Sequence, residues 1–345
     1  MRWPRTMLIH ATVLLTGALS NSAAFATGEW SQLRACAGVP DRDQRLACFD
    51  ALVADADDAA KSGAVNSTPP QTGARVEERA AKPVGSSHLS RLWELDPGDK
   101  NQPLTFRPHR DNYLLLANYS RDPNSEPYRP FQQLDPSTKL NKTELAFQLG
   151  FKLKLLEQVF ASPVDLWFGY TQRSFWQAYN SDATSPFRET NYEPELMAVA
   201  PLNVEMLGWR ARLLNVGLVH QSNGQAALLS RSWNRMYAQV GLERGNFTVL
   251  ARLWKPVGSL QGNEDIRDYY GDGDVVGTYR MGGQEFSVLA RSNFKTGHGA
   301  LQASWAFPLK SNVKGYVQVF NGYGDSLINY NASQQTVGLG VLIAD

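Results

Sequence analysis

The stretch VGLGVLI at residues 337–343 alternates large apolar residues with smaller ones, and it is the clearest guide in the chain to the fold. Side chains of a β-strand point alternately to its two faces, so the odd-numbered residues from Val337 to Ile343 share one apolar face. Segments 301–307 and 313–319 repeat the alternation. A period of two sustained over several residues predicts β-strands with one apolar face.

The part of the chain that follows Asp111 is a succession of such segments, separated by Gly, Asn, Asp, Ser and Pro. Their number, about a dozen, and their spacing are typical of hairpins that cross a bilayer. A soluble β-sandwich alternates in the same way and is the alternative. Trp and Tyr are abundant near the ends of the segments, where membrane barrels carry interfacial aromatic girdles. We therefore expect an all-β transmembrane barrel.

Residues 1–26 have the features of a secretory signal peptide. Arg2 and Arg5 precede an apolar stretch at residues 7–19, and AFA at 24–26 is the small-x-small pattern after which a signal peptidase cuts. A membrane anchor is the alternative, but the apolar stretch is shorter than the ~20 residues that span a bilayer. No later segment is apolar enough for a transmembrane helix, so a protein that spans a membrane with this sequence must do so as a barrel.

Two regions of different composition separate the signal peptide from the predicted barrel at 88–345. Residues 27–50 are polar and contain the two cysteines of the chain, Cys36 and Cys48. In an exported chain we expect a disulfide between them. A metal site is the alternative, but the segment has no nearby histidines that would complete four ligands. Residues 51–87 are rich in Ala, Ser, Pro, Thr and charge, which predicts a flexible linker.

The charge of the chain excludes one class of partner. The formal net charge is +1 and the isoelectric point is about 7.8. A chain without a broad basic field is not expected to bind nucleic acid.

A histidine and a serine end an otherwise apolar row in the segment 212–222. His220 and Ser222 lie on one face of the predicted strand, with Cα atoms about 7 Å apart. Asn234 heads the matching row of the next segment, and an antiparallel hairpin would bring it beside His220. These residues could mark only the boundary between membrane and water. Alternatively, Asn234 accepts from the imidazole, His220 takes the proton of Ser222, and the Gly224 N–H stabilises an oxyanion.

Several blocks of sequence resemble the signature blocks of the outer-membrane phospholipase A family. The resemblance is firm from about residue 108 to the C-terminus and looser back to His88. The blocks are YTQRSFWQ at 170–177, SPFRETNYEPE at 185–195, HQSNG at 220–224, SRSWNR at 230–235 and GYGDSLINYN at 322–331. Together, ordered blocks are far more specific than a lone serine or histidine. The resemblance implies a twelve-stranded antiparallel transmembrane β-barrel in the bacterial outer membrane, with an active site on its outer face. Residues 27–87 lie outside the resemblance, and we expect them to form a short N-terminal periplasmic extension.

The family resemblance also implies roles for individual residues. Matching positions make Ser222 the nucleophile, His220 the general base and acid, Asn234 the group that orients His220, and Gly224 the oxyanion donor. Gln172 matches a glutamine at the interface of the family homodimer.

A calcium ion at each active site, in the dimer interface, is implied as well. Its ligands would be Ser230, the Gln225 carbonyl, Thr184 of the other chain, and a group near Gly262. Calcium prefers six to eight oxygen ligands, often carboxylates. The loop 225–229 carries no acid. We therefore expect the partner chain and water to complete the site.

The resemblance thus implies a calcium-dependent phospholipase A that hydrolyses sn-1 and sn-2 acyl esters to lysophospholipid and fatty acid. The alternatives are a non-enzymatic porin-like barrel, with an open polar lumen, and a soluble periplasmic esterase.

Glu193 and Glu195 occupy odd positions of their predicted strand, whereas the outward Leu196 occupies an even one. We therefore expect both glutamates inside the barrel, paired with arginines such as Arg188 or Arg235.

Overall fold

A computed structural model describes most of the chain in two units, Met1–Glu77 and Glu78–Asp345. The described residues are Cys36, 39–41, 43–45, 47–48, 51, 87–132, 139–183, 186–260, 262–310 and 312–343. The predicted signal peptide at 1–26 lies outside them, as does the predicted linker except for its first and last residues. In the first unit a disulfide joins Cys36 to Cys48, whose Cα atoms are 5.6 Å apart.

The second unit is a closed antiparallel β-barrel of twelve strands, β2 to β13, which confirms the predicted fold class. Each strand pairs with its neighbours in the chain, and β13 pairs with β2 to close the barrel. The short strand β1 pairs with β3 beyond the end of β2. The bounds are β1 Arg107–Pro108, β2 Asn112–Ser120, β3 Thr143–Leu156, β4 Asp165–Trp176, β5 Phe187–Met206, β6 Trp209–Ser222, β7 Ser232–Arg244, β8 Phe247–Val257, β9 Gly273–Met281, β10 Gln284–Ser292, β11 Gly299–Lys310, β12 Val313–Tyr323 and β13 Ser333–Ile343.

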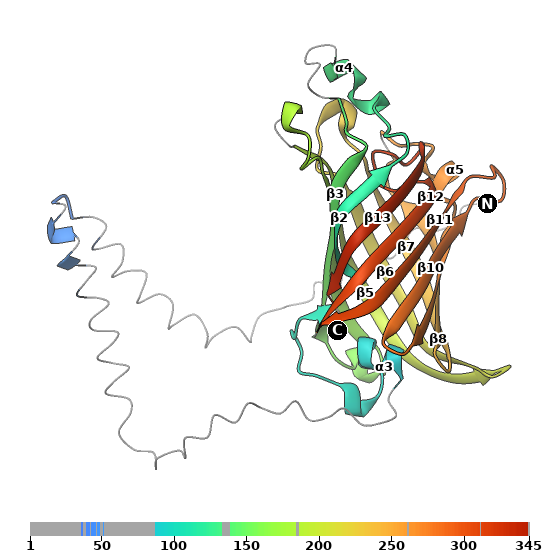
Figure 1. The fold of residues 1–345 in the computed structure, drawn as a ribbon. Helices are drawn as coiled ribbons and strands as arrows, with labels where there is room; N and C mark the ends of the chain where they lie inside the picture. Colours follow the sequence, from blue (N-terminus) through green and yellow to red (C-terminus); the bar gives the residue numbers. More distant parts are fainter. Residues whose placement is uncertain are drawn as a thin grey trace, which may run out of the picture. The chain divides into compact units, whose positions relative to one another are not determined.

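The described helices of the second unit are short and lie at the two ends of the barrel (Figure 1). The α-helices are α3 His88–Trp93, α4 Arg129–Gln132 and α5 Ile266–Tyr270. The 3-10 helices are η1 Pro97–Asp99, η2 Glu126–Tyr128, η4 Val159–Ala161, η5 Ser181–Ala183 and η6 Ala227–Leu229. None of the helices in the described ranges has the length and hydropathy needed to cross a membrane.

The connections between strands differ in length at the two ends of the barrel. Long connections, at 121–142, 177–186, 223–231, 258–272, 293–298 and 324–332, gather at the end with α4 and α5, here called the loop end (Figure 1). The other end, here called the turn end, holds α3 and mostly tight turns, such as Leu207–Gly208. In outer-membrane barrels the short turns are periplasmic and the long loops extracellular.

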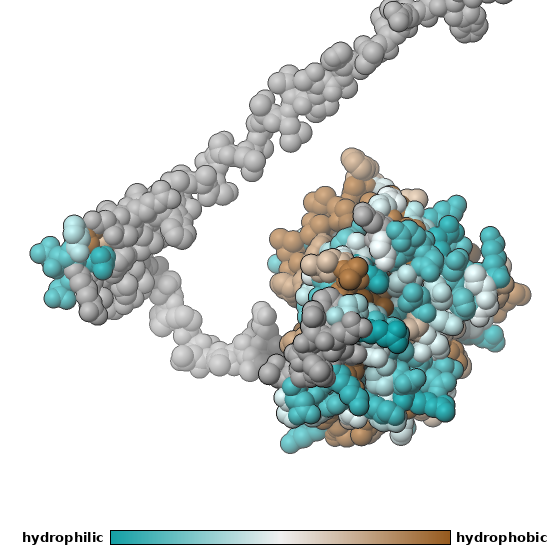
Figure 2. Space-filling view, turned by 90° about the horizontal axis from the view of Figure 1, so that it is seen from above, coloured by the Kyte–Doolittle hydropathy of each residue, from teal (hydrophilic) through white to brown (hydrophobic). Residues whose placement is uncertain are grey.

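Large apolar side chains cover the outside of the barrel wall. The residues that are at least two-fifths exposed include Leu149, Leu196, Leu214, Val216, Leu218, Met236, Leu253, Val275, Phe286, Val288, Leu301, Trp305, Val319, Val337 and Leu339. Seen from above, hydrophilic residues cover much of the barrel end and hydrophobic residues lie at its rim (Figure 2). This arrangement suits a hydrocarbon surround and agrees with the alternation read from the sequence.

The lumen is lined by charged and polar side chains around a cavity of about 830 Å³. Glu195 pairs with His109 at 2.7 Å, and Glu193 pairs with Arg235 at 3.5 Å. The inward orientation of both glutamates and the partner Arg235 are as predicted. The predicted partner Arg188 is wrong, because that guanidinium forms a bidentate pair with Glu144 nearer the loop end, at 2.8 and 2.9 Å.

The lead-in before the barrel closes part of its turn end, a role that the sequence did not predict. Leu89 and Trp93 of α3 belong to the buried apolar cluster of the lumen, and the Lys152 Nζ atom lies 4.0 Å from the centre of the Trp93 ring. His109 enters the lumen where the chain bulges between β1 and β2. A Cβ atom at Gly150 would stand 2.0 Å from the His109 carbonyl oxygen, so only glycine permits this approach.

Candidate active site

His220 and Ser222 lie at the loop end of β6, on the outer face of the barrel. The row that leads to them consists of Leu214, Val216 and Leu218, which are 40%, 45% and 55% exposed. His220 is itself exposed and Ser222 is half-buried. The structure therefore places both polar side chains where the apolar wall meets the loops.

Asn234 lies directly opposite His220 in the register between β6 and β7. The His220 Nδ1 atom donates a hydrogen bond of 2.8 Å to the Asn234 Oδ1 atom. Because a carbonyl oxygen only accepts, Nδ1 is the donor, and in the neutral imidazole Nε2 then has the lone pair. This tautomer has a basic nitrogen available for the proton of a nucleophile.

Ser222 follows His220 by two positions, so its side chain emerges on the same face. Within the described part of the chain no hydrogen bond joins the Ser222 hydroxyl to the His220 imidazole. The strand spacing leaves the two groups near enough to meet by rotation of their side chains. Such catalytic hydrogen bonds often tighten only when substrate binds.

Gly224 begins the turn beyond Ser222 in a left-handed conformation with φ of +62°. A Cβ atom there would lie 3.0 Å from Cε2 of Tyr192, the residue that pairs with Ser222 across the sheet. The described residues supply no acceptor for the Gly224 N–H. A free backbone donor two residues after a nucleophile has the chemistry of an oxyanion donor.

The loop 223–231 is organised by Asn223, which the sequence did not single out. Its side chain is 3% exposed. Oδ1 accepts from the N–H groups of Gln225 at 3.3 Å and Arg231 at 2.9 Å, and Nδ2 donates to the Leu229 carbonyl at 2.7 Å. Asn223 occupies an odd position in HQSNG, and odd positions of this strand point away from lipid. This pattern could have indicated that Asn223 is buried, but not which groups it contacts.

Three of the residues predicted to bind calcium, Gln225, Ser230 and Gly262, come from two loops that meet at the loop end. A Cβ atom on Gly262 would lie 3.2 Å from the Ser230 carbonyl oxygen, so the loop 258–272 contacts the loop 223–231 there. Gln225 is exposed in the latter loop. Thr184 lies outside the described residues.

Glu264 is an acid beside this contact that the sequence analysis overlooked. Its Oε1 atom accepts from the Gly262 N–H at 3.2 Å. The neighbouring Asp265 is engaged, because it accepts from the Tyr330 hydroxyl at 2.5 Å. Burial, followed by this hydrogen bond, raises the pKa of Tyr330. Among the described residues no cluster of three or more His, Cys, Asp or Glu side chains could hold a metal.

The donors on these two loops nevertheless fit a hard cation in kind. Hydroxyl and carbonyl oxygens of Ser230 and Gln225, with the Glu264 carboxylate, are the ligand types that calcium takes. Together these described residues offer fewer than the six to eight oxygens that calcium prefers, so a bound ion would need further ligands from water or a second chain.

Gln172 lies on the outer face of β4 within a chain of polar groups. Tyr170 donates its hydroxyl to Gln172 Oε1 at 3.1 Å, and Gln172 Nε2 donates to Ser174 Oγ at 3.1 Å. Ser174 is in turn 3.1 Å from the Thr190 hydroxyl. Polar groups on a lipid-facing wall are costly unless paired, and these are paired with one another.

Comparison with known proteins gives consistent matches. A family model described as phospholipase A1 matches residues 89–343. A candidate phospholipase A1 of Neisseria meningitidis is 39% identical, and the alignment covers 96% of this chain and 95% of that protein. The crystal structure of the Salmonella typhi outer-membrane phospholipase, a dimer with bound calcium, matches with a TM-score of 0.67 and 36% identity over 71% of this chain and 94% of that one.

A second solved structure is similar to the same extent. It is an active-site mutant of the outer-membrane phospholipase A of Escherichia coli in which an asparagine is replaced by alanine. Its TM-score is 0.67 at 35% identity, over 71% of this chain and 94% of that one.

Proposed function

The chain belongs to the phospholipase A1 family of outer-membrane β-barrels, and from that premise we propose that it hydrolyses acyl esters of glycerophospholipids at the outer face of the bacterial outer membrane. The products are lysophospholipid and fatty acid. The observation that carries the proposal is the hydrogen bond of 2.8 Å between His220 and Asn234, on a wall otherwise covered by apolar side chains. A lipid reaches such a site from the side, whereas a soluble ester does not.

Ser222 is the proposed nucleophile. Its hydroxyl attacks the ester carbonyl while His220 Nε2 takes the proton, and Asn234 holds the imidazole in the tautomer that permits this. The ester C–O bond then breaks as His220 returns the proton to the leaving alcohol. Water, activated by the same histidine, releases the fatty acid from the acyl-enzyme.

Gly224 is the proposed donor to the oxyanion. The negative charge on the carbonyl oxygen develops only during attack, so a donor fixed beforehand lowers the barrier selectively. The left-handed backbone at Gly224 holds its N–H in one orientation, and Tyr192 packs against it.

Calcium is proposed as the cofactor, one ion for each active site, bound by Ser230, Gln225 and the region of Gly262 and Glu264. When bound it supplies positive charge near the developing oxyanion. Thr184 of a second copy is the proposed ligand from across a homodimer, with Gln172 in the interface. Support comes from the similar Salmonella typhi enzyme, which crystallised as a dimer with calcium. Assembly and calcium would then stabilise each other by mass action.

The proposal is tested by fatty-acid release from phosphatidylcholine in mixed micelles. We expect activity with calcium, none with a chelator, and a loss of at least about a thousandfold in Ser222→Ala. Ser333→Ala is the matched control, because Ser333 is an exposed serine at the loop end of β13. Activity that persists in Ser222→Ala would remove the proposed nucleophile. No activity under any condition, together with ion conductance in planar bilayers, would favour the porin-like alternative.

A further inference from the structure

The loop 223–231 carries two groups that the proposed reaction needs in fixed positions, the Gly224 N–H and the Gln225 carbonyl. Neither belongs to a strand, so the sheet does not fix them. Contacts of side chains must therefore fix them, and the importance of these contacts for catalysis rests on the function proposed above.

Asn223 ties the start of this loop to its end. Its backbone N–H donates to the Arg231 carbonyl at 3.1 Å, and its Oδ1 atom accepts from the Arg231 N–H at 2.9 Å. Its Nδ2 atom reaches Leu229 at 2.7 Å, and the Gln225 N–H reaches its Oδ1 atom at 3.3 Å. One buried carboxamide thus links both flanks of the turn that contains Gly224.

A second buried group lies under Asn223. The Glu189 side chain is 1% exposed, and its Oε2 atom accepts from Asn223 Nδ2 at 3.5 Å. Its Oε1 atom accepts from Asn191 Nδ2 at 2.6 Å and from the Ile328 N–H at 3.0 Å. Glu189 therefore contacts both the proposed active-site loop and the loop 324–332.

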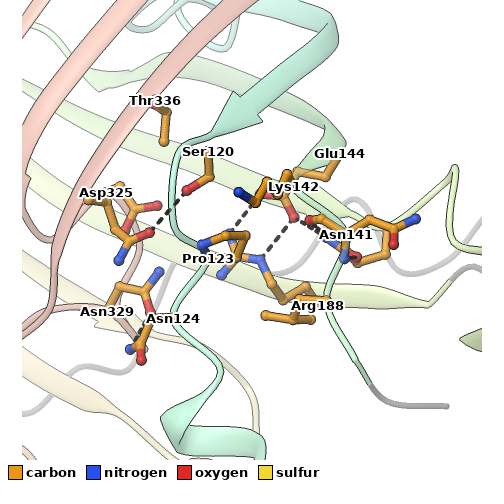
Figure 3. Close-up of a pocket in the computed structure, with 13 residues that line it drawn as sticks. Ser120, Pro123, Asn124, Asn141, Lys142, Glu144, Arg188, Asp325, Asn329 and Thr336 are labelled. Atoms are coloured by element: carbon orange, nitrogen blue, oxygen red, sulfur yellow. Dashed lines mark hydrogen bonds and ion pairs between the residues drawn. The ribbon is translucent and has the colours of Figure 1, made fainter.

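The loop 324–332 is itself held inside the barrel. Leu327 and Ile328 are 0% and 1% exposed, and the Leu327 N–H donates to Asn191 Oδ1 at 2.8 Å. Figure 3 shows a further anchor, in which Asn124 Nδ2 donates to Asn329 Oδ1 at 3.0 Å. Glu189 therefore contacts a loop that is held in place by buried side chains and hydrogen bonds.

We propose that Asn223 is a positioning residue of the active site, which holds Gly224 and Gln225 in the geometry that catalysis requires, and that Glu189 fixes the orientation of its carboxamide. Glu189 is all acceptor when ionised, so the Nδ2 face of Asn223 turns toward it. The Oδ1 face is then left to the N–H groups of Gln225 and Arg231. The inner loop 324–332 acts on the site through this pair of side chains.

The main test is Asn223→Asp in the full-length refolded protein. The change keeps the size and the Oδ1 acceptor, but it places an oxygen against the Leu229 carbonyl and the Glu189 carboxylate. We expect kcat at saturating calcium to fall about tenfold or more, with KM within about twofold, because displacement of a catalytic group affects mainly the transition state. Amide hydrogen exchange in peptides covering 223–231 should become faster in the same variant.

Asn293→Asp is the matched control. Asn293 organises the loop 293–298 by the same pattern, since its Oδ1 atom accepts from the Lys295 N–H at 2.9 Å and its Nδ2 atom donates to the Arg267 carbonyl at 2.9 Å. This variant should keep kcat within about twofold of wild type, because its loop carries none of the proposed catalytic groups. Equal losses in the two variants would overturn the proposal.

Glu189→Gln provides a milder variant that also probes the direction of the hydrogen bond. If the oxygen of the new carboxamide at position 189 accepts from the Ile328 N–H, its NH2 group faces the Asn223 NH2 group. Two donors then oppose each other, so kcat should fall, as in Asn223→Asp. In Glu189→Gln combined with Asn223→Asp, the new amide can donate to the new carboxylate, and kcat should recover above that of Asn223→Asp alone. A double variant no better than Asn223→Asp would remove Glu189 from the proposal.

These outcomes separate this inference from the proposed function. If wild type is active, Ser222→Ala is inactive and Asn223→Asp retains wild-type kcat and exchange, only the positioning role fails. If wild type hydrolyses no phospholipid, the function fails, while the exchange of 223–231 still reports whether Asn223 shapes the loop.

Discussion

The His220 imidazole and the Asn234 carboxamide face each other across an antiparallel strand pair and share a hydrogen bond of 2.8 Å. Both lie on the lipid-facing wall of a closed barrel. The register of two strands therefore holds the proposed general base in one tautomer, a task that buried loops perform in many soluble hydrolases.

Asn234→Ala removes that orientation without removing the base. We expect kcat for phospholipid hydrolysis to fall about tenfold to a hundredfold, since a free imidazole populates both tautomers and more than one rotamer. The heat-induced unfolding of the barrel should be unchanged, because Asn234 is exposed. Kinetics in mixed micelles and a thermal melt of the same preparation measure both quantities. A variant with wild-type kcat would show that Asn234 does not orient the base.

Gly224→Ala should reduce activity more than stability. The left-handed backbone costs a residue with a Cβ atom roughly 1–2 kcal/mol, and the new methyl would press on Tyr192. Gly245→Ala is the control, since Gly245 has φ of +55° and nothing within 4 Å of its Cβ position. Melting should shift similarly in both variants, while kcat should fall only in Gly224→Ala. Equal kcat values would argue against Gly224 as oxyanion donor.

Glu264→Gln should weaken calcium activation. Loss of a carboxylate beside Gly262 removes negative charge from the proposed site, so the calcium concentration for half-maximal activity should rise on the order of tenfold. Glu205→Gln, in the turn-end hairpin between β5 and β6, is the control for charge alone. Titration of chelator-treated enzyme with calcium measures the shift. The same midpoint in both variants would exclude Glu264 as a ligand.

Gln172→Leu should weaken dimerisation. The change replaces a polar side chain, paired with Tyr170 and Ser174, by an apolar one that lipid solvates well, so the proposed dimer should lose about 1 kcal/mol. Chemical crosslinking in detergent across a protein dilution series would detect a dissociation constant raised about fivefold. Gln335→Leu, at an outward position of β13, should leave it unchanged. No difference between the two variants would contradict the predicted interface.

The sequence was informative where the fold imposes a period of two. The row from Leu214 to Ser222 and the pairing of His220 with Asn234 follow from alternation and an antiparallel hairpin. The inward glutamates follow from the same rule, as does the partner Arg235.

The sequence could not give contacts between loops or between distant strands. Some contacts depend on how the long connections fold over the barrel end. They are the approach of Gly262 to Ser230, the position of the nearby Glu264 and the hydrogen bonds of Asn223. The predicted partners of Arg188 are wrong for a related reason. An odd or even position in a strand determines the face on which a side chain lies, but not its depth in the lumen. The closure of the turn end by α3 was missed because a six-residue helix carries almost no periodic signal.

Covalent capture of the proposed nucleophile tests the mechanism most directly. The refolded protein would be treated with a long-chain alkyl fluorophosphonate in detergent with calcium, digested, and the modified peptide identified by mass spectrometry. We predict one modification, on Ser222, that is absent in Ser222→Ala and strongly slowed in His220→Ala. An enzyme that hydrolyses phospholipid while Ser222 stays unmodified, or that is labelled at another residue, would contradict it.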